Sequence, residues 1–323
     1  MFLKCISLQK QKKRRKLSIS KNSFFIADGK SKDLHIWLRI CYNFSDNILN
    51  KIIVWEMVND MVDIKHTFVI CAYKESQYLE ECILSLKKQT VKSLVIMVTS
   101  TPNDFIKEIA NKYSVPLYVN EGTGGITQDW NFGYSQVKTP YLTIAHQDDV
   151  YLENYTAHLL EAFEKSKKPL IFFSDYAELR EKQVVEVNQL LRIKRIMLLP
   201  MRIPGTKGSR FVRRMILAFG SPICCPSVAY ARNNLPTPVF QDGFRSNEDW
   251  EAWERLSKLK GDFLFDKQIL VYHRIHEESE TTAIIQDNKR SEEDVIMYRK
   301  FWPEPIVKFL TKLYAKGQKS NNM

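Results

Sequence analysis

The sequence predicts an α/β fold in which a mostly parallel, doubly wound sheet carries helices on both faces. Short apolar runs of strand length alternate with segments of helical periodicity from residue 67 to residue 173. Several of these runs end directly in polar residues, and ligands of such sheets bind off the carboxyl ends of the strands. With 323 residues, 44% of them hydrophobic, the chain is long enough for one large α/β domain or two ordinary ones.

The first strand is expected at residues 67–73, because an unbroken apolar run is typical of a parallel strand that is buried on both faces. A helix follows, with Leu79 and Ile83 spaced to share one face. The second strand, 94–98, ends in a polar turn that can cap a helix over 105–113. By the same patterns we expect strands at 115–119, 141–145, 169–173 and 268–271, helices at 127–135, 154–165 and 248–259, and an amphipathic tail at 298–314.

The net charge of +11 is distributed unevenly along the chain. Residues 1–60 contain 12 Lys or Arg and 5 Asp or Glu, and residues 187–241 contain nine Lys or Arg and no acidic residue. Such segments are either solvated or contact an anionic membrane or nucleic acid. A nucleic-acid partner is not expected, because the basic cluster 10–16 has no adjacent aromatic residues for base stacking. We expect 1–60 to be an extension that need not belong to the fold. Residues 187–241 could hold a phosphate-bearing lipid acceptor or rest on an anionic membrane, and the absence of acidic residues favours the membrane.

The sequence contains no run of about 18 apolar residues, so no transmembrane helix is predicted. Its six cysteines lack the Cys-x-x-Cys spacing of zinc sites, and a disulfide framework is not expected. We therefore expect a cytoplasmic protein, with peripheral contact at the inner face of the cell membrane.

An acidic pair, Asp148 and Asp149, follows the strand predicted at 141–145. Two adjacent carboxylates repel each other, and a hard divalent ion such as Mg²⁺ or Mn²⁺ relieves this by taking their oxygens as ligands. The alternative is that the pair only caps the helix expected at 154–165, since acidic side chains favour helix N-termini. The pair alone does not decide between these readings.

The order of several motifs resembles glycosyltransferase family 2, the inverting enzymes with the GT-A fold. The strand and polar turn at 69–75 are followed by the helix 78–86 and by Gln89-Thr90. Gly124-Gly125 then precedes a helix with Asp129 and Asn131, and the acidic strand end at 145–151 completes the pattern. The resemblance covers roughly residues 66–280 and implies a GT-A fold with a smaller C-terminal acceptor-side region.

The resemblance also implies roles for individual residues on the donor side. The residues implied to bind the nucleotide sugar are Ala72, Tyr73, Glu75, Thr99, Ser100, Asp129, Asn131 and Asp148. Asp149 and His276 would ligate a Mg²⁺ or Mn²⁺ that bridges the donor diphosphate. Two positions depart from the family pattern: His146 stands where a carboxylate is frequent, and Thr99-Ser100 replaces acidic residues that recognise uracil.

On the acceptor side, Glu248 and Asp249 match a family pair that opens a helix. Asp249 would be the catalytic base that deprotonates the acceptor hydroxyl, and Glu248 would orient the acceptor or its loop. The alternative is an acidic first turn that only complements the helix dipole. Arg274 could neutralise a phosphate.

The expected function is transfer of a sugar from a nucleotide-diphosphate donor to a glycan or lipid-linked acceptor, in bacterial-type cell-envelope or capsular polysaccharide synthesis. Residues 61–180 would form the nucleotide-sugar-binding half, 181–285 the acceptor half and 286–323 a helical tail. A nucleotidyltransferase with a related core and a basic nucleic-acid-binding protein are the alternatives. A nucleotidyltransferase would need a Gly-rich phosphate loop after the first strand, where this chain has Tyr73-Lys74-Glu75-Ser76.

Overall fold

The computed structural model describes residues 64–276 and 289–320, so the predicted extension 1–60 lies outside the described part of the chain. The strands are β1 (His66–Cys71), β2 (Leu94–Thr99), β3 (Leu117–Val119), β4 (Tyr141–His146), β5 (Val150–Tyr151), β6 (Pro169–Arg180), β7 (Gln183–Val185), β8 (Val228–Ala231) and β9 (Asp262–Ile275). The helices are α3 (Leu79–Lys87), α4 (Asp104–Lys112), α5 (Ile126–Gln136), α6 (Tyr155–Glu164), α7 (Gln189–Leu198), α8 (Arg210–Leu217), α9 (Glu248–Leu256), α11 (Lys289–Arg299) and α12 (Glu304–Ser320).

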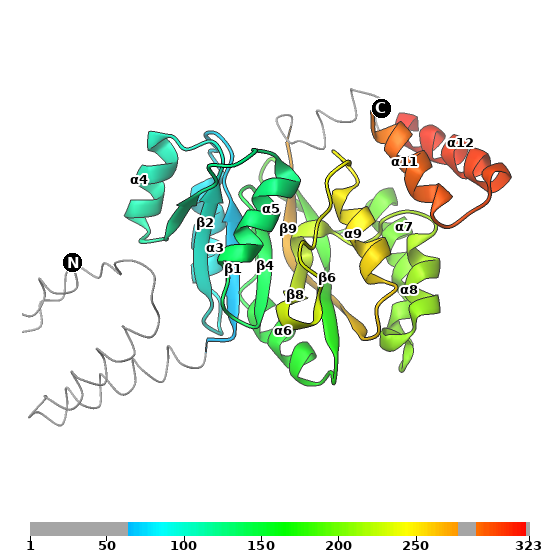
Figure 1. Cartoon of the computed structure of the whole chain (residues 1–323), viewed down its shortest axis with the longest axis horizontal. Helices are drawn as coiled ribbons and strands as arrows, with labels where there is room; N and C mark the ends of the chain where they lie inside the picture. Colours follow the sequence, from blue (N-terminus) through cyan, green and yellow to red (C-terminus); the bar gives the residue numbers. More distant parts are fainter. Residues whose placement is uncertain (1–63, 277–288, 321–323) are drawn as a thin grey trace, which may run out of the picture. The chain divides into compact units, whose positions relative to one another are not determined.

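The strands form one sheet in the order β3-β2-β1-β4-β8-β6-β9-β5, with β7 paired to β6 (Figure 1). Strand β1 is parallel to both β2 and β4, β2 is parallel to β3, and β6 is parallel to β9. Strand β8 enters antiparallel between β4 and β6. The predicted α/β fold with a mostly parallel sheet is confirmed, and strands from both predicted halves contribute to this one sheet.

Helices pack on both faces of the sheet, as predicted. Successive residues of a strand point to opposite faces. On one face, the Cα of Gly133 in α5 lies so close to β1 that a Cβ would be 2.5 Å from Val69, so only glycine fits there. On the other face, the ring of Phe68 lies 5.8 Å from that of Tyr155 in α6. Both faces of β1 are therefore buried, which explains its unbroken apolar sequence.

Several element boundaries differ from the sequence prediction: β1 ends at Cys71 rather than at 73, and β6, expected at 169–173, continues to Arg180. Three further differences have a local reason. Strand β3 begins after Pro116, which has no backbone N–H to donate to the sheet. The strand predicted at 268–271 is only the later part of β9, whose pairing with β6 shifts register near Asp266. The tail expected at 298–314 is divided between α11 and α12, because Pro303 begins a new helical turn.

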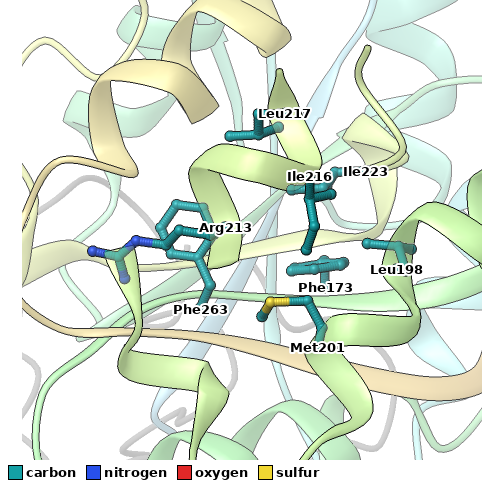
Figure 2. A pocket seen from close by; sticks show the side chains of 8 residues that line it. All are labelled: Phe173, Leu198, Met201, Arg213, Ile216, Leu217, Ile223 and Phe263. Carbon is teal, nitrogen blue, oxygen red and sulfur yellow. The ribbon is translucent and has the colours of Figure 1, made fainter. Parts of the chain in front are cut away.

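Helices α7 and α8, joined by the 3-10 helices η2 (Leu199–Arg202) and η3 (Thr206–Gly208), cover part of the sheet beside α9. Their inner faces meet over Phe173 and Phe263, around a small void of about 10 Å³. Figure 2 shows the eight side chains that line it. Arg213 lies there with 1% of its surface exposed and its guanidinium 4.7 Å from the centre of the Phe263 ring. It donates hydrogen bonds to the carbonyls of Ser257, Leu259 and Gly261, just beyond the end of α9.

Candidate active site

The predicted site residues of the acidic motif lie between β4 and β9. Asp148 and Asp149 occupy the turn that joins β4 to β5, closed by a hydrogen bond from the Asp149 N–H to the His146 carbonyl of 3.3 Å. Strand β5 pairs antiparallel with the end of β9, where Val150 lies opposite Tyr272. This pairing brings His273, Arg274 and His276 to the acidic turn from more than 120 positions later in the sequence.

Asp149 is fully buried. Its Oδ1 accepts a 2.8 Å hydrogen bond from the backbone N–H of Arg274 and lies 3.0 Å from Nδ1 of His273. Burial opposes protonation of His273, but the carboxylate of Asp149 overcomes this and raises the pKa of the imidazole above its usual value. The second oxygen, Oδ2, is buried and has no hydrogen-bond partner among the described residues.

Asp148 is more exposed to solvent than Asp149, and its Oδ2 accepts a hydrogen bond from Nε2 of His276 at 2.9 Å. Burial favours its neutral form, but the hydrogen bond from His276 and the neighbouring imidazoles lower its pKa below the usual range. The expected phosphate ligand Arg274 instead holds this turn: its Nε donates to the Asp148 carbonyl and its guanidinium pairs with Glu81 at 2.6 Å. The same guanidinium lies 4.3 Å from the ring centre of Tyr78.

His146 ends β4 and stacks on Trp130, with 5.4 Å between the ring centroids. Its Nδ1 is 4.0 Å from the unpartnered oxygen of Asp149. One ligand atom from each of His146, Asp148 and Asp149 lies within 4.8 Å of the others. A single divalent ion with bonds of about 2.1 Å would need these atoms to be at most about 4 Å apart, so a small inward movement would suffice.

Other predicted donor-side residues gather at the ends of β1 and β2. Tyr73 is half-exposed, and its backbone N–H and carbonyl both bond the Gln147 amide, at 2.9 and 3.1 Å. Ser100 donates to Asp129 at 2.6 Å, and Asn120 donates to the other carboxylate oxygen at 2.8 Å. These contacts join the β1, β2 and β4 ends into one edge of the sheet.

The remaining donor-side predictions have different surroundings. Ala72 and Thr99 are buried, whereas Glu75 is exposed at the start of the loop after β1. Asn131 is directed elsewhere: its amide donates to the Phe240 carbonyl at 2.8 Å and accepts from the Phe240 N–H at 3.1 Å. Both polar ends of Asn131 thus hold the loop before α9 against α5.

Glu248 and Asp249 open α9, as predicted; Glu248 is buried and Asp249 is half-buried. Burial raises the pKa of both Cys224 and Cys225, and the negative charges of Asp149 and Asp249 add to this at each thiol. Both carboxylates are therefore close enough to act electrostatically on the same cysteine segment, although they are 100 positions apart in the sequence. That segment is anchored by a 2.7 Å hydrogen bond from the Tyr151 hydroxyl to the Pro226 carbonyl.

Sequence reasoning missed three residues that shape the site. His273 bonds Asp149, and Gln147 bonds the backbone of Tyr73. In the sequence, both are marked only by their position beside other polar residues. Lys194, on α7, donates to the Tyr176 hydroxyl at 3.0 Å, and its charge acts on both His273 and Cys224. In the sequence, Lys194 is one of several basic residues in the segment 187–241, and nothing there distinguishes it as the one that lies near the site.

Known proteins share both sequence and fold with this chain. An uncharacterized glycosyltransferase of Rickettsia conorii is 25% identical over 236 residues, covering 71% of this chain and 37% of that protein. An uncharacterized glycosyltransferase of Rickettsia typhi is 22% identical over 229 residues, covering 68% of this chain and 66% of that protein. The chain thus spans between about a third and two thirds of the length of these relatives.

Solved structures with GT-A-type folds have the same arrangement of elements. The mannosyltransferase PcManGT of Pyrobaculum calidifontis, in complex with GDP-Man and Mn²⁺, superposes with a TM-score of 0.52 at 12% identity, covering 88% of this chain and 79% of that one. S. aureus TarS 1-349, in complex with UDP-GlcNAc, gives a TM-score of 0.51 at 14% identity over 77% of this chain and 70% of that one.

A family model described as glycosyl transferase family 2 matches residues 67–232, which is just over half of the chain. The match spans β1 to β8, including the Asp148–Asp149 turn. Neither the nucleotidyltransferase nor the nucleic-acid-binding alternative is favoured by this match. Together with the fold, it establishes that the chain belongs to glycosyl transferase family 2.

Proposed function

We propose that this chain is an inverting glycosyltransferase that moves a sugar from a nucleoside-diphosphate donor to a hydroxyl of a glycan or lipid-linked acceptor. The observation that carries this proposal is the acidic turn between β4 and β5, where ligand atoms of His146, Asp148 and Asp149 lie within 4.8 Å of one another. Asp249, in the first turn of α9, is the second acidic site. One acidic site can serve the donor diphosphate while the other serves the acceptor. Bacterial-type cell-envelope or capsular polysaccharide synthesis is the setting we propose.

The residues present fit a divalent ion, because Asp149 keeps one fully buried oxygen without a partner among the described residues. Asp149, with Asp148 and His146, would hold Mg²⁺ or Mn²⁺, and the other predicted ligand, His276, meets this group through its hydrogen bond to Asp148. When bound, such an ion neutralises negative charge on the diphosphate as the sugar–phosphate bond breaks. Lys194 would add positive charge on the same side of the site.

For the nucleotide, we propose that the base and ribose lie along the edge formed by the ends of β1 and β2. Tyr73 offers an exposed ring, Glu75 an exposed carboxylate, and Ser100 a hydroxyl oriented by Asp129. Thr99 and Ala72 are buried beneath them, so they would shape this edge through the backbone. Neutral hydroxyls at 99–100 can bond a base without a charge preference.

We propose that Asp249 takes the proton from the acceptor hydroxyl as that oxygen attacks the anomeric carbon. Half-buried at the first turn of α9, its carboxylate has solvent access for an acceptor, whereas buried Glu248 would orient the helix start. A positioned carboxylate base contributes typically about 10²–10⁴-fold to such a reaction.

The test is release of nucleoside diphosphate from a panel of nucleotide sugars, with water as the acceptor. Asp249→Asn should lower the rate at least about 100-fold while the Kd for nucleoside diphosphate, measured by calorimetry with Mn²⁺, stays within about twofold. Asp104→Asn, at an exposed carboxylate on α4, is the matched control and should behave as wild type. A near-normal rate for Asp249→Asn would place the base elsewhere.

We also propose peripheral contact with an anionic membrane through the outer face of α7, η2 and α8. Large apolar side chains are exposed there, interleaved with arginines and with no acidic residue from 187 to 241. The apolar members with about half or more of their surface exposed are Ile193, Ile196, Leu199, Ile203, Phe211 and Phe219. Basic and apolar side chains on one helical face favour binding in the headgroup region. Within the described residues, no helix has the length and apolarity needed to cross a bilayer.

A further inference from the structure

His146 stands in the acidic motif where the family frequently has a carboxylate, and the structure places its imidazole against the ion-binding oxygens. We infer that His146 makes this a mixed nitrogen–oxygen site that selects first-row transition-metal ions over Mg²⁺. The inference rests on the proposed function, because it concerns the same divalent-ion site. It goes further by assigning the choice of ion to one side chain.

The first argument is the pair of buried atoms that the protein leaves without partners. Asp149 Oδ2 and His146 Nε2 are both buried and unbonded among the described residues. A buried polar atom without a hydrogen bond destabilises a folded protein. The His146 ring faces Asp149 Oδ2 through its other nitrogen, Nδ1, at 4.0 Å, so the imidazole lies beside the unbonded carboxylate oxygen as a candidate ligand.

The second argument is that both side chains are held in place. The His146 ring is stacked on Trp130 with an interplanar angle of 25°, and its backbone continues the β4 pairing with Cys71 of β1. Asp149 is fixed through Oδ1 by His273 and the Arg274 N–H, so its other oxygen keeps one orientation. Preorganised ligands of this kind define which ion fits.

The third argument is ligand chemistry. Mg²⁺ is a hard ion that takes oxygen ligands almost exclusively and keeps several waters. Imidazole nitrogen suits the later first-row ions, whose affinity for mixed sites rises from Mn²⁺ to Co²⁺. The site thus offers the His146 imidazole beside two carboxylates, whereas Nε2 of His276 is hydrogen-bonded to Asp148 at 2.9 Å. An all-carboxylate site would show this preference less strongly.

The experiment measures direct binding of Mg²⁺, Mn²⁺ and Co²⁺ to the full chain by calorimetry, without nucleotide. Wild type should bind Co²⁺ most tightly and Mg²⁺ least. His146→Asp, which restores a carboxylate, should lower the ratio of Mg²⁺ to Co²⁺ dissociation constants by about tenfold or more. His146→Asn, a neutral oxygen ligand, should lower it in the same direction and serves if the aspartate variant does not fold.

The control is His158→Asn, because His158 pairs with Asp266 rather than with the acidic turn and should leave the ratio unchanged. An unchanged ratio in both folded His146 variants would overturn the inference while leaving the proposed transfer reaction intact. Equal affinity of wild type for Mg²⁺ and Co²⁺ would do the same. Failure of all three ions to bind would overturn both this inference and the metal-dependent donor site.

Discussion

Arg213 is predicted to hold α8 on the rest of the fold, and its replacement by methionine tests this quantitatively. The side chain is 1% exposed and donates to three carbonyls that follow α9, at Ser257, Leu259 and Gly261. These groups lie where a helix ends and its carbonyls lack intrahelical partners. Methionine keeps most of the apolar contact with Phe263 but leaves the three carbonyls without this donor.

Each buried carbonyl that loses its partner costs about 1–3 kcal/mol, so three could cost about 3–9 kcal/mol. Removing the arginine also removes the penalty of burying its charge, which amounts to several kcal/mol. We expect a net loss of about 3 kcal/mol in the free energy of unfolding. For a domain of this size, that corresponds to a fall in Tm of roughly 6–12 °C.

The measurement is urea unfolding followed by tryptophan fluorescence, with Arg210→Met as the matched control. Arg210 lies on the same helix but is exposed, so its loss should change stability by less than about 0.5 kcal/mol. Arg213→Lys should be intermediate, since one ammonium cannot reproduce the guanidinium fork. If Arg213→Met and Arg210→Met differ by less than about 1 kcal/mol, the three hydrogen bonds do not hold α8 as argued.

Two further predictions concern acid stability and membrane contact. His66 is fully buried between Ser93 and Thr143, and burial lowers its pKa to about 3. As the pH falls below about 6.5, this histidine is therefore protonated in the unfolded chain before it is protonated in the folded chain. The contribution of neutral His66 to the free energy of unfolding is therefore intact above pH 6.5 and lost progressively down to pH 3. His66→Gln should reduce the pH dependence of the free energy of unfolding by up to about 1.4 kcal/mol per pH unit, measured by urea unfolding between pH 6 and 4. Parallel stability curves for the two proteins would contradict this prediction. Replacing both Ile196 and Phe211 by glutamine should weaken binding to vesicles with anionic lipid at least about tenfold, because each inserted side chain contributes about 1.5–3 kcal/mol. Leu84→Gln, at an exposed position on α3, is the control, and equal cosedimentation of the two variants with vesicles would exclude the α7–α8 face as the contact.

The donor half of the fold could be predicted where its strands are continuous apolar runs, whereas the two-residue strand β5 was missed. Residues 67–71 and 141–145 are buried on both faces of the sheet, so nearly every position had to be apolar. Strand β9 could not be recognised in full, since Asp266 and Lys267 interrupt its apolar sequence where its pairing with β6 shifts register. Hydrophobic periodicity alone gives no sign of such an irregularity.

The sequence identified the carboxylates of the candidate site but not the residues that hold these carboxylates in place. Asp148, Asp149 and Asp249 could be found because they follow a strand or open a helix, both of which are visible in the sequence. His273 could not, because its role depends on the pairing of β9 with the two-residue strand β5. Contacts between residues more than 120 positions apart are set by tertiary structure and leave no local pattern.

The pairing of β5 with β9 limits how this protein can be divided or recombined. The segment that matches the family ends at residue 232, whereas β9 begins at Asp262. A fragment that stops at the end of the match would retain Asp148 and Asp149 but lose every β9 group that fixes them. Exchange of acceptor-side regions between relatives should therefore be confined to the segment between the end of β6 at Arg180 and the start of β9 at Asp262, so that β9 stays in the same chain as the carboxylates it fixes.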